Sequence, residues 1–415
     1  MNETPEALDG ALDWLQGRWD LLRGRRYLKG LRQLLRPLHA HQDCANRQLH
    51  FDEYVSYIVL HLLNPSYRSM RSLQQASRSE CFRRRFQLPY FSLGSFSEAG
   101  STFQAEELLP LIERLSRRVE PRLADPRLKG LTRKPVLFDG TLVRALQSMD
   151  WASWLSNEDR SAKMHLEFDL LRGAPTGATL TDGNADEREE LRQRLDSGKL
   201  YILDRGLVDY SLQKETLQEQ SSFLIRLHNN ASYKILQSCP ISEAAAAAGV
   251  EQDLIVSLGC DDSPELRSHP LRLVRIRVKN SSARPRNKKV SGKSKRRVTA
   301  GDYTLLLATD LLTVDVLLIA LLYRYRWQIE LYFRWFKHVL HADDLLSRKA
   351  NGLSIIIYCA LIVSLVLSHW TGRTPSKRIV ELVGGLLFGY LTGHDLQEHL
   401  DDLNRIEMER ASKKT

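Results

Sequence analysis

The chain has few cysteines, no CxxC pair and no long uninterrupted apolar run. Five cysteines are scattered over 415 residues, which argues against a disulfide framework and against structural zinc, and fits a reducing cytoplasm. The first 15 residues include four acids, so we expect no signal peptide. The most apolar stretch, Leu353–Leu367, spans 15 residues, whereas a membrane helix needs about 20. We therefore expect a buried core helix there, no membrane partner and a cytoplasmic location.

The composition is that of a globular protein with a surplus of positive charge. A chain of 415 residues exceeds one ordinary domain and predicts roughly two to four. With 43% hydrophobic and 27% charged residues it can bury sizeable cores, which excludes disorder of the whole chain. The net charge of +10 points to a polyanion such as nucleic acid, but many basic proteins bind none.

Residues 1 to about 130 are predicted to be helical. Apolar residues recur at helical spacing in Leu28–Leu35 and in Tyr54–Leu62. Between Arg68 and Arg85 lie six arginines and a single acid, Glu80. This cluster could follow a DNA backbone, and a solvated face of a helical bundle would explain it equally well. The DNA-contact candidates within it are Arg83, Arg84 and Arg85.

From about Pro135 the pattern changes to strands. Apolar runs of strand length occur at Val136–Phe138, where the run stops at Asp139–Gly140, and at Leu200–Leu203. His165–Leu170 alternates with period two, which is typical of a half-exposed strand. Further strands are predicted at Thr176–Leu180 and Phe223–Leu227, and a charged helix at Glu187–Leu195. Strands, a helix and more strands together indicate a mixed α/β sheet.

Residues 229 to 300 interrupt this pattern. Asp253–Leu258 and Leu271–Val278 resemble strands, and a low-complexity alanine run precedes them. Lys279–Arg297 then carries nine basic residues, no acid and no apolar periodicity, which indicates a mobile loop. Such a loop either contacts phosphates, with Lys288 and Lys289 as candidates, or is simply a solvated loop.

Helices are predicted for most of the remaining chain. Tyr303–Thr309 is expected to return to the sheet, and Val314–His341 to form one long helix. A buried helix over Leu353–Trp370 and an amphipathic helical tail over Arg378–Ile406 complete the chain.

Two aspartates each follow a short apolar run. Asp139 comes directly after Phe138, and Asp204 directly after Leu203. A carboxylate just past a buried strand is held at the sheet edge and faces a crevice. Two such carboxylates from neighbouring strands can share divalent cations, especially Mg²⁺. Because Asp–Gly is also a common turn dipeptide, the pair alone does not decide between a metal site and two turns.

The helix over Val314–His341 adds a third carboxylate. At about 100° per residue, Tyr323, Arg326, Glu330 and Lys337 share one face about 60° wide. The opposing face is apolar, with Ile329, Phe333, Phe336 and Leu340. A carboxylate flanked by cations suited to phosphate oxygens predicts a metal ligand beside groups that hold a phosphodiester. A salt-bridged surface helix is the alternative.

These four residues resemble the Tyr-Arg-Glu-Lys signature of bacterial insertion-sequence transposases, the group typed by insertion sequence four. The similarity covers about residues 50 to 370. Two departures are Asp186, where histidine is commoner, and Leu207–Val208, where an aromatic residue often stands. The segments that resemble the family are Phe138–Thr141, Gly183–Glu189, Asp204–Gly206, Tyr325–Glu330 and Phe333–Lys337.

The resemblance implies a ribonuclease H-like fold with a β-rich insertion between the second aspartate and the glutamate. The expected domains are an N-terminal helical DNA-binding domain (1–130), a catalytic domain (131–228 and 301–372), the insertion with its basic loop (229–300) and a C-terminal helical segment (373–415).

The resemblance also implies roles for individual residues. Asp139, Asp204 and Glu330 would form a metal-binding catalytic triad for two Mg²⁺ ions, with Mn²⁺ as a substitute. Tyr323, Arg326 and Lys337 would contact DNA phosphates near the transposon end. Trp327 or Trp335 would stack on a flipped base, or both would pack in the core.

The function that follows is that of a DDE transposase in the bacterial cytoplasm, associated with the nucleoid when bound to DNA. It would cleave double-stranded DNA at its terminal inverted repeats and join the ends to target DNA, as a homodimer. The alternatives are a metal-dependent endonuclease without strand transfer and a non-catalytic DNA-binding remnant.

Overall fold

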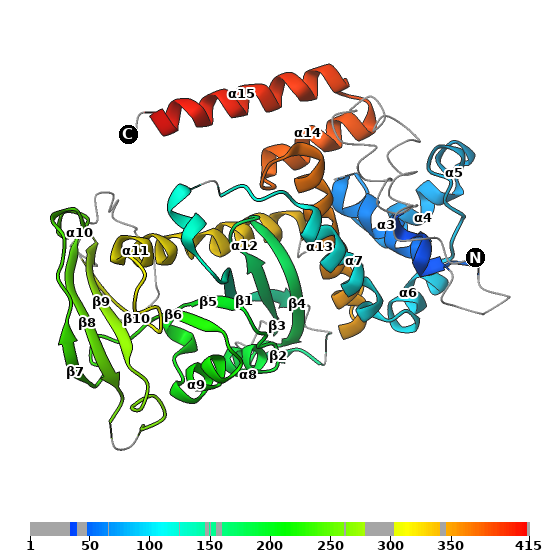
Figure 1. Cartoon of the computed structure of the whole chain (residues 1–415). Coiled ribbons are helices and arrows are strands. Elements are labelled where there is room, and N and C mark those ends of the chain that lie inside the picture. Colours follow the sequence, from blue (N-terminus) through cyan, green and yellow to red (C-terminus); the bar gives the residue numbers. More distant parts are fainter. Residues whose placement is uncertain are drawn as a thin grey trace, which may run out of the picture. The chain divides into compact units, whose positions relative to one another are not determined.

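The computed structural model shows a mixed α/β protein with two compact units (Figure 1). The first unit contains described residues of Met1–Leu123, Gly140–Ala185 and Glu330–Thr415, and the second those of Ala124–Asp139 and Asp186–Ile329. The structure describes residues 34–39, 48–64, 66–123, 125–145, 149, 151–154, 160–260, 263–278, 303–340 and 346–412.

The N-terminal part of the first unit is helical, as predicted. Its core is aromatic: Tyr57 meets Phe91 edge to face, with ring centroids 4.7 Å apart, and Tyr54 meets Phe96 in the same way. Such pairs stabilise beyond their buried area. The helical leucines before residue 34 lie outside the described residues. The helices are α3 Phe51–Leu63, α4 Met70–Arg78, α5 Glu80–Phe86, α6 Leu93–Thr102, η2 Ala105–Leu108 and α7 Leu109–Arg118.

The buried helix predicted near residue 360 is α13 (Ala350–Thr371). It is the helix in the described part of the chain that is long and apolar enough to cross a membrane, and 83% of its apolar window is buried. It packs against α3, α6 and α7 and against strand β4 (Ala174–Asp182). Tyr358 donates a hydrogen bond to the carbonyl oxygen of Ala178 at 3.2 Å. The prediction of a core helix is confirmed.

The strands of the first unit are β2 (Ser153–Trp154), β3 (Arg160–Asp169) and β4, which pair antiparallel. The prediction that β3 is half exposed is wrong, because both of its faces are covered. The polar face is tolerated because it finds partners: His165 bonds with Thr181 at 2.8 Å, and buried polar groups with hydrogen bonds avoid the desolvation cost.

The sheet order is β2-β3-β1-β5-β6-β10-β9-β8-β7, with β4 on β3. The three central strands of the second unit, β1, β5 and β6, are parallel, and the later strands are antiparallel. The mixed sheet is therefore confirmed. The bounds are β1 Lys134–Ala145, β5 Lys199–Leu203, β6 Ser222–Arg226, β7 Tyr233–Ser238, β8 Val250–Leu258, β9 Leu271–Val278 and β10 Tyr303–Thr309.

Strand β1 does not stop at Asp139, as the sequence predicted. It continues to Ala145, so that Asp139 lies inside the strand and at the last residue of the second unit. Asp–Gly forms a turn readily when the glycine has a positive φ, but Gly140 is not among the positive-φ glycines of the chain. The dipeptide is extended strand here.

The predicted β-rich insertion is confirmed by β7, β8 and β9. They extend the same sheet, because β9 pairs with β10 and β10 pairs with β6. The alanine run forms a short helix, α10 (Glu243–Ala247), which begins after its N-cap Ser242. The basic loop, with Lys288 and Lys289, lies outside the described residues.

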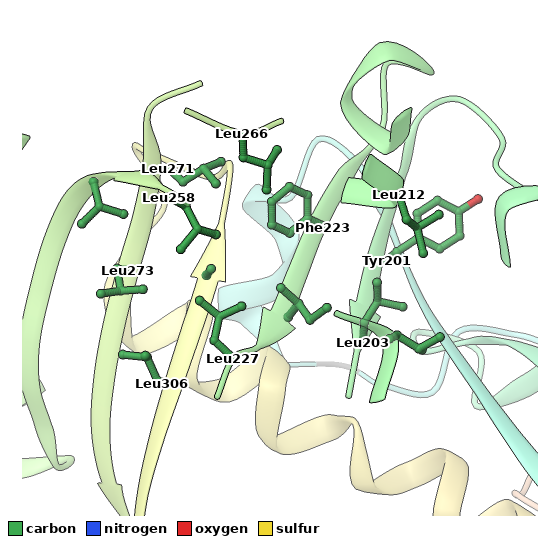
Figure 2. Packing of buried hydrophobic residues seen from close by; sticks show 14 of the residues in the cluster. Tyr201, Leu203, Leu212, Phe223, Leu227, Leu258, Leu266, Leu271, Leu273 and Leu306 are labelled. Carbon is green, nitrogen blue, oxygen red and sulfur yellow. The ribbon is translucent and has the colours of Figure 1, made fainter. Parts of the chain in front are cut away.

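One core cluster joins the parallel strands to the insertion within the second unit (Figure 2). Leucines of β8, β9 and β10 pack toward Phe223 of β6 and Tyr201 of β5. The Tyr201 hydroxyl accepts a hydrogen bond from the Asp196 N–H at 3.0 Å and donates one to the carbonyl oxygen of Arg194 at 3.3 Å. A buried aromatic with a satisfied hydroxyl fixes its strand both by packing and by hydrogen bonding.

The predicted long helix is two helices, α11 (Val316–Tyr325) and α12 (Trp327–Leu340). They meet at Arg326, which keeps right-handed helical φ and ψ angles. The hydrogen bonds at the joint change to the i−3 pattern, from Arg326 N–H to Tyr323 and from Ile329 N–H to Arg326, so the helix tightens without glycine or proline.

The remaining helices flank these elements. The tail is helical, as predicted, and a break at Gly389, which ends α14 with a φ of 80°, divides it. The bounds are η3 Pro126–Gly130, α8 Glu187–Arg192, η4 Arg205–Leu207, α9 Tyr210–Gln218, α14 Lys377–Phe388 and α15 Gly393–Ser412.

Candidate active site

Asp139 and Asp204 stand at equivalent positions of two paired parallel strands. Strand β1 pairs with β5 at a constant offset of 65 residues, from Lys134 with Lys199 to Leu137 with Ile202. The same offset joins 139 to 204. Because side chains at equivalent positions of parallel strands point to the same face of a sheet, the two carboxylates are neighbours.

Both carboxylates face Arg326. Its Nη1 lies 3.9 Å from Oδ2 of Asp139, and its Nε lies 4.0 Å from Oδ1 of Asp204. The aspartate side chains are partly open, with 23% of Asp139 and 42% of Asp204 exposed. The guanidinium is therefore the common counter-ion of two acids that solvent can still reach.

Tyr323 completes this group from α11. Its buried ring brings the hydroxyl to Asp204, and the hydroxyl donates a hydrogen bond to Oδ1 at 3.1 Å. The Arg326 guanidinium carbon lies 5.9 Å from the centre of the Tyr323 ring, within the range of a cation–π contact. The structure thus brings together four predicted site residues within the second unit: Asp139, Asp204, Tyr323 and Arg326.

The electrostatics of Asp204 keep it ionised at neutral pH. Partial burial raises its pKa, but the charge of Arg326 lowers it, as do hydrogen bonds from the Arg205 N–H and from Tyr323. The net pKa lies below the usual value. Burial first, and then the charge of Asp204, raise the pKa of Tyr323, so its hydroxyl keeps its proton. A charged acceptor beside a protonated donor is a stable hydrogen-bond pair.

Glu330 and Lys337 lie farther along α12, in the first unit. Glu330 is half-buried and follows Arg326 by four residues, or about one helical turn. Lys337 is exposed, and desolvation lowers its pKa. Each unit is described by itself, so the full triad with Glu330 remains a prediction.

The two tryptophans of α12 have different environments. Trp335 is buried and packs on Tyr332, with ring centroids 5.5 Å apart, so it belongs to the core. Trp327 is 50% exposed. The apolar face predicted for this helix is buried at Ile329, Phe333 and Phe336.

The site contains a cation that the sequence did not single out. Arg226 ends β6, the parallel neighbour of β5, and its charge also lowers the pKa of Asp204. The rule that identified Asp204, a polar side chain at the end of a buried parallel strand, applies equally to Arg226. It was passed over because it ends an apolar run as an ordinary boundary residue would.

Arg272 of β9 fixes the chain just before α11. It makes a buried bidentate ion pair with Asp253 of β8, at 2.8 and 2.6 Å. Its remaining Nη1 donates hydrogen bonds to the carbonyl oxygens of Leu312 and Val314. The insertion therefore holds the segment that leads into the helix of Tyr323, and the sequence gave no signal for this contact.

A cavity of about 410 Å³ follows Asp204 along the chain. Val208, at the end of η4, forms part of its wall, together with Tyr210 and His228. Leu207 is buried in the core cluster instead. The departure from the family pattern at Leu207–Val208 thus affects one wall residue of this cavity and neither aspartate.

A second group of possible metal ligands lies on α15. His394, Asp395 and Glu398 have ligand atoms within 4.8 Å of one another. However, Asp395 Oδ2 already accepts hydrogen bonds from the N–H and hydroxyl of Thr392, both at 2.7 Å. This is a capping arrangement at a helix start, and the cluster is exposed, so it has no feature of a catalytic centre.

The arginines predicted to contact DNA are on the surface. Arg83, Arg84 and Arg85 are all exposed in the last turn of α5, above the buried Phe82 and Phe86. Arg84 pairs with Glu80 at 2.5 Å. Surface pairs of this kind contribute little to stability, so the arginines are available for other contacts.

Comparisons with known proteins identify the conserved region. Residues 131–366 match the family profile described as a transposase DDE domain. A protein of Sinorhizobium fredii named as the transposase y4zB is 28% identical over 228 residues, which are 54% of this chain and 58% of that protein. A protein of Geobacillus stearothermophilus named as the transposase of insertion sequence element IS5377 is 21% identical over 252 residues, 60% of either chain.

The chain thus spans about three fifths of the length of these relatives. Among solved structures, a chain of the piggyBac transposase synaptic complex with hairpin DNA is 12% identical, with a TM-score of 0.41, over 96% of this chain and 80% of that chain.

Proposed function

The chain belongs to the DDE transposase family, whose profile covers residues 131–366, and we propose that it cleaves DNA at the ends of an insertion sequence and joins them to target DNA. The observation that supports this most directly is the pairing of Asp139 and Asp204 at one offset of two parallel strands, with Arg326 between them. Two strand-held carboxylates at a partly open sheet edge are what a metal-assisted phosphodiester reaction requires.

The proposed metal ligands are Asp139, Asp204 and Glu330, for two Mg²⁺ ions that Mn²⁺ can replace. Their donor atoms are all carboxylate oxygens, which suit hard divalent cations. The lowered pKa of Asp204 keeps that ligand ionised. Bound divalent ions would activate a water or a DNA 3′-hydroxyl as the nucleophile and neutralise the leaving oxygen.

The other residues of the signature would hold the DNA. We propose that Tyr323, Arg326 and Lys337 contact phosphates near the transposon end. A guanidinium binds a phosphate as readily as it pairs with carboxylates, so the position of Arg326 suits both the free enzyme and the complex. Tyr323 orients Asp204 through its hydrogen bond.

The exposed arginines on α5, Arg83, Arg84 and Arg85, would follow the DNA backbone, and Lys288 and Lys289 would add phosphate contacts from the basic loop. Because such contacts release counter-ions, binding should weaken with salt. The proposed partners are terminal inverted repeats and target DNA, bound by a homodimer in the bacterial cytoplasm at the nucleoid.

We propose that this member belongs to the group typed by insertion sequence four, on the spacing of Tyr323, Arg326, Glu330 and Lys337. The proposed domains are 1–130 for DNA binding, 131–228 with 301–372 for catalysis, 229–300 for the insertion and 373–415 for the C-terminal helices. The fold of the catalytic part is the mixed, ribonuclease H-like sheet that the resemblance implies.

Cleavage of a supercoiled donor plasmid tests the proposal. The plasmid carries the DNA that flanks the gene on both sides, and the reaction contains Mg²⁺. Wild type should linearise it and release the end fragment, whereas Asp204→Asn should bind the same DNA without cutting it. If Asp204→Asn cuts as wild type does, the proposed centre is wrong. Cutting without joining to a second plasmid would favour the endonuclease alternative, and binding without cutting by wild type would favour the remnant.

A further inference from the structure

Helix α4 presents one exposed face made only of arginine and glutamine. Arg71, Gln74, Gln75 and Arg78 follow one another at i, i+3, i+4 and i+7, which places them on a face about 100° wide. Arg71, Gln75 and Arg78 are exposed and Gln74 is half-buried. The helix contains no acidic residue, so no intrahelical partner neutralises the two guanidinium groups.

The opposite face of α4 fixes the helix to the first unit. Leu73 and Ser77 are buried there, and the helix packs against α5 and α6. Its start is capped reciprocally: Ser69 Oγ accepts the N–H of Ser72 at 3.1 Å, and Ser72 Oγ accepts the N–H of Ser69 at 3.1 Å. A capped helix with a buried back face presents its front face in one orientation.

Tyr90 orients two side chains of that face. The Arg78 guanidinium carbon lies 6.0 Å from the centre of the Tyr90 ring, at the distance of a cation–π contact. Gln74 Nε2 donates a hydrogen bond to the Tyr90 hydroxyl at 3.3 Å. Tyr90 is itself 41% exposed. The tyrosine therefore restricts Arg78 and Gln74 without covering them.

Arginine and glutamine are the side chains that recognise bases by paired hydrogen bonds. Arginine binds the O6 and N7 atoms of guanine, and glutamine binds the N6 and N7 atoms of adenine, from the major groove, which is wide enough for a helix. A solvated face would not need glutamines oriented by a neighbouring aromatic ring, and a face that binds only phosphates would not need glutamines at all.

We propose that α4 lies in the major groove of duplex DNA and reads its bases through Arg71, Gln74, Gln75 and Arg78. The inference rests on the proposed function, since it takes DNA as the ligand of this unit. It separates the tasks of two consecutive helices: α4 supplies sequence preference, whereas the consecutive arginines of α5 contact the backbone without reading sequence.

Selection from a random duplex pool tests this division with the full-length protein. Wild type and the double variant Gln74→Ala/Gln75→Ala are each used to enrich a 25-base-pair random library, which is then sequenced. Both substitutions replace surface residues with the best helix former, so thermal melting should be unchanged. Gln218→Ala, an exposed glutamine on α9, is the matched control.

Wild type and Gln218→Ala should enrich the same motif. In the double variant, discrimination at one or two adjacent adenine positions should fall roughly 5- to 150-fold, with the rest of the motif unchanged. The triple variant Arg83→Ala/Arg84→Ala/Arg85→Ala should keep the motif and reduce the slope of log affinity against log salt by up to about 2.7.

Two outcomes overturn the inference. If the double variant enriches the full wild-type motif, α4 does not read bases. If the triple variant loses base preference while the double variant keeps it, α5 is the reading helix. A wild type that enriches no motif and binds no duplex would contradict the proposed function itself, which is a separate result.

Discussion

Asp139 and Asp204 stand at the same level of two adjacent parallel strands, 65 residues apart in sequence, with the guanidinium of Arg326 within 4.0 Å of each. The offset is the one that the hydrogen-bonded pairs of β1 and β5 already show. The neighbouring carboxylates therefore depend on the pairing of two strands and on no flexible loop. Such a site is preorganised, because strand backbones hold their side chains more closely than loops do.

Glu330→Gln tests the third member of the proposed triad. The substitution keeps the shape of the side chain and removes its charge, so end cleavage with Mg²⁺ should fall by at least about a hundredfold while binding of the same DNA is kept. Cleavage is followed on the donor plasmid and binding by fluorescence anisotropy.

Lys337→Ala, two helical turns later, is the comparison for Glu330→Gln. It should weaken DNA binding or the alignment of the end, without changing the Mg²⁺ concentration that gives half-maximal cleavage. Persistent cleavage by Glu330→Gln would mean that the carboxylate of Glu330 is not a metal ligand.

Tyr323→Phe tests the contact with Asp204. The variant loses one hydrogen bond to an ionised carboxylate, an interaction of about 1.5–3 kcal/mol, and keeps the buried ring. We expect cleavage to slow roughly 10- to 100-fold, with a thermal midpoint within a few degrees of wild type. Tyr332→Phe, which loses a buried hydroxyl bond to Ser364, should instead lower stability and leave the Mg²⁺ requirement as it was. Equal rates for Tyr323→Phe and wild type would show that the hydroxyl does not orient Asp204.

Arg272→Ala should be strongly destabilising. It leaves Asp253 as an unpaired buried charge, which costs about 3–5 kcal/mol, and frees the carbonyls before α11. The double variant Asp253→Leu/Arg272→Met removes both charges and should recover most of the unfolding midpoint in urea. It should still cleave more slowly, because Leu312 and Val314 remain unanchored. Full recovery of both quantities would show that the anchor is dispensable.

Asp209→Ala predicts a pH-dependent loss of stability. Asp209 caps α9 through the N–H groups of Ser211 and Leu212. Burial raises its pKa, but these hydrogen bonds and the charge of Arg192 lower it below the usual value. A lowered carboxyl pKa stabilises the fold above the unfolded pKa, about 3.9, and this stabilisation is lost as the pH falls through the folded value.

The substitution should therefore cost about 1 kcal/mol at pH 7 and much less at pH 3. Urea unfolding at both pH values measures this, with the exposed Glu219→Gln at the other end of α9 as the control. An equal loss at pH 3 and pH 7 would mean that the carboxylate charge takes no part in the cap.

The sequence was informative where burial on both faces makes a strand visible as an apolar run. Leu200–Leu203 and Phe223–Leu227 were located in this way, and with them the position of Asp204. It failed where the decisive contact is distant in sequence. Nothing in Asp139–Gly140 shows that Gly140 keeps an extended conformation, because strand pairing rather than the dipeptide sets that conformation.

The same limit applies to the helix and to its anchor. The spacing of Tyr323, Arg326 and Glu330 indicated a shared face, and the structure places the first two at Asp204. The change to i−3 hydrogen bonds at Arg326 has no mark in the sequence, because neither proline nor glycine causes it. Arg272 looked like one of several alternating basic residues in β9, and only its burial beside Asp253 reveals its role.

Strand β5 is buried on both faces, and this has a consequence for how the protein folds. A slip of one residue would turn every side chain to the opposite face, yet Leu200, Ile202 and Leu203 would still meet apolar surroundings. Hydrophobicity alone therefore cannot reject the slipped pairing, which would carry Asp204 away from Asp139. The Tyr201 hydroxyl can reject it, since a slip would break its hydrogen bonds to residues 194 and 196. One phenol would act as the register check of the catalytic sheet, so that Tyr201→Phe should yield a misfolded, inactive fraction on refolding.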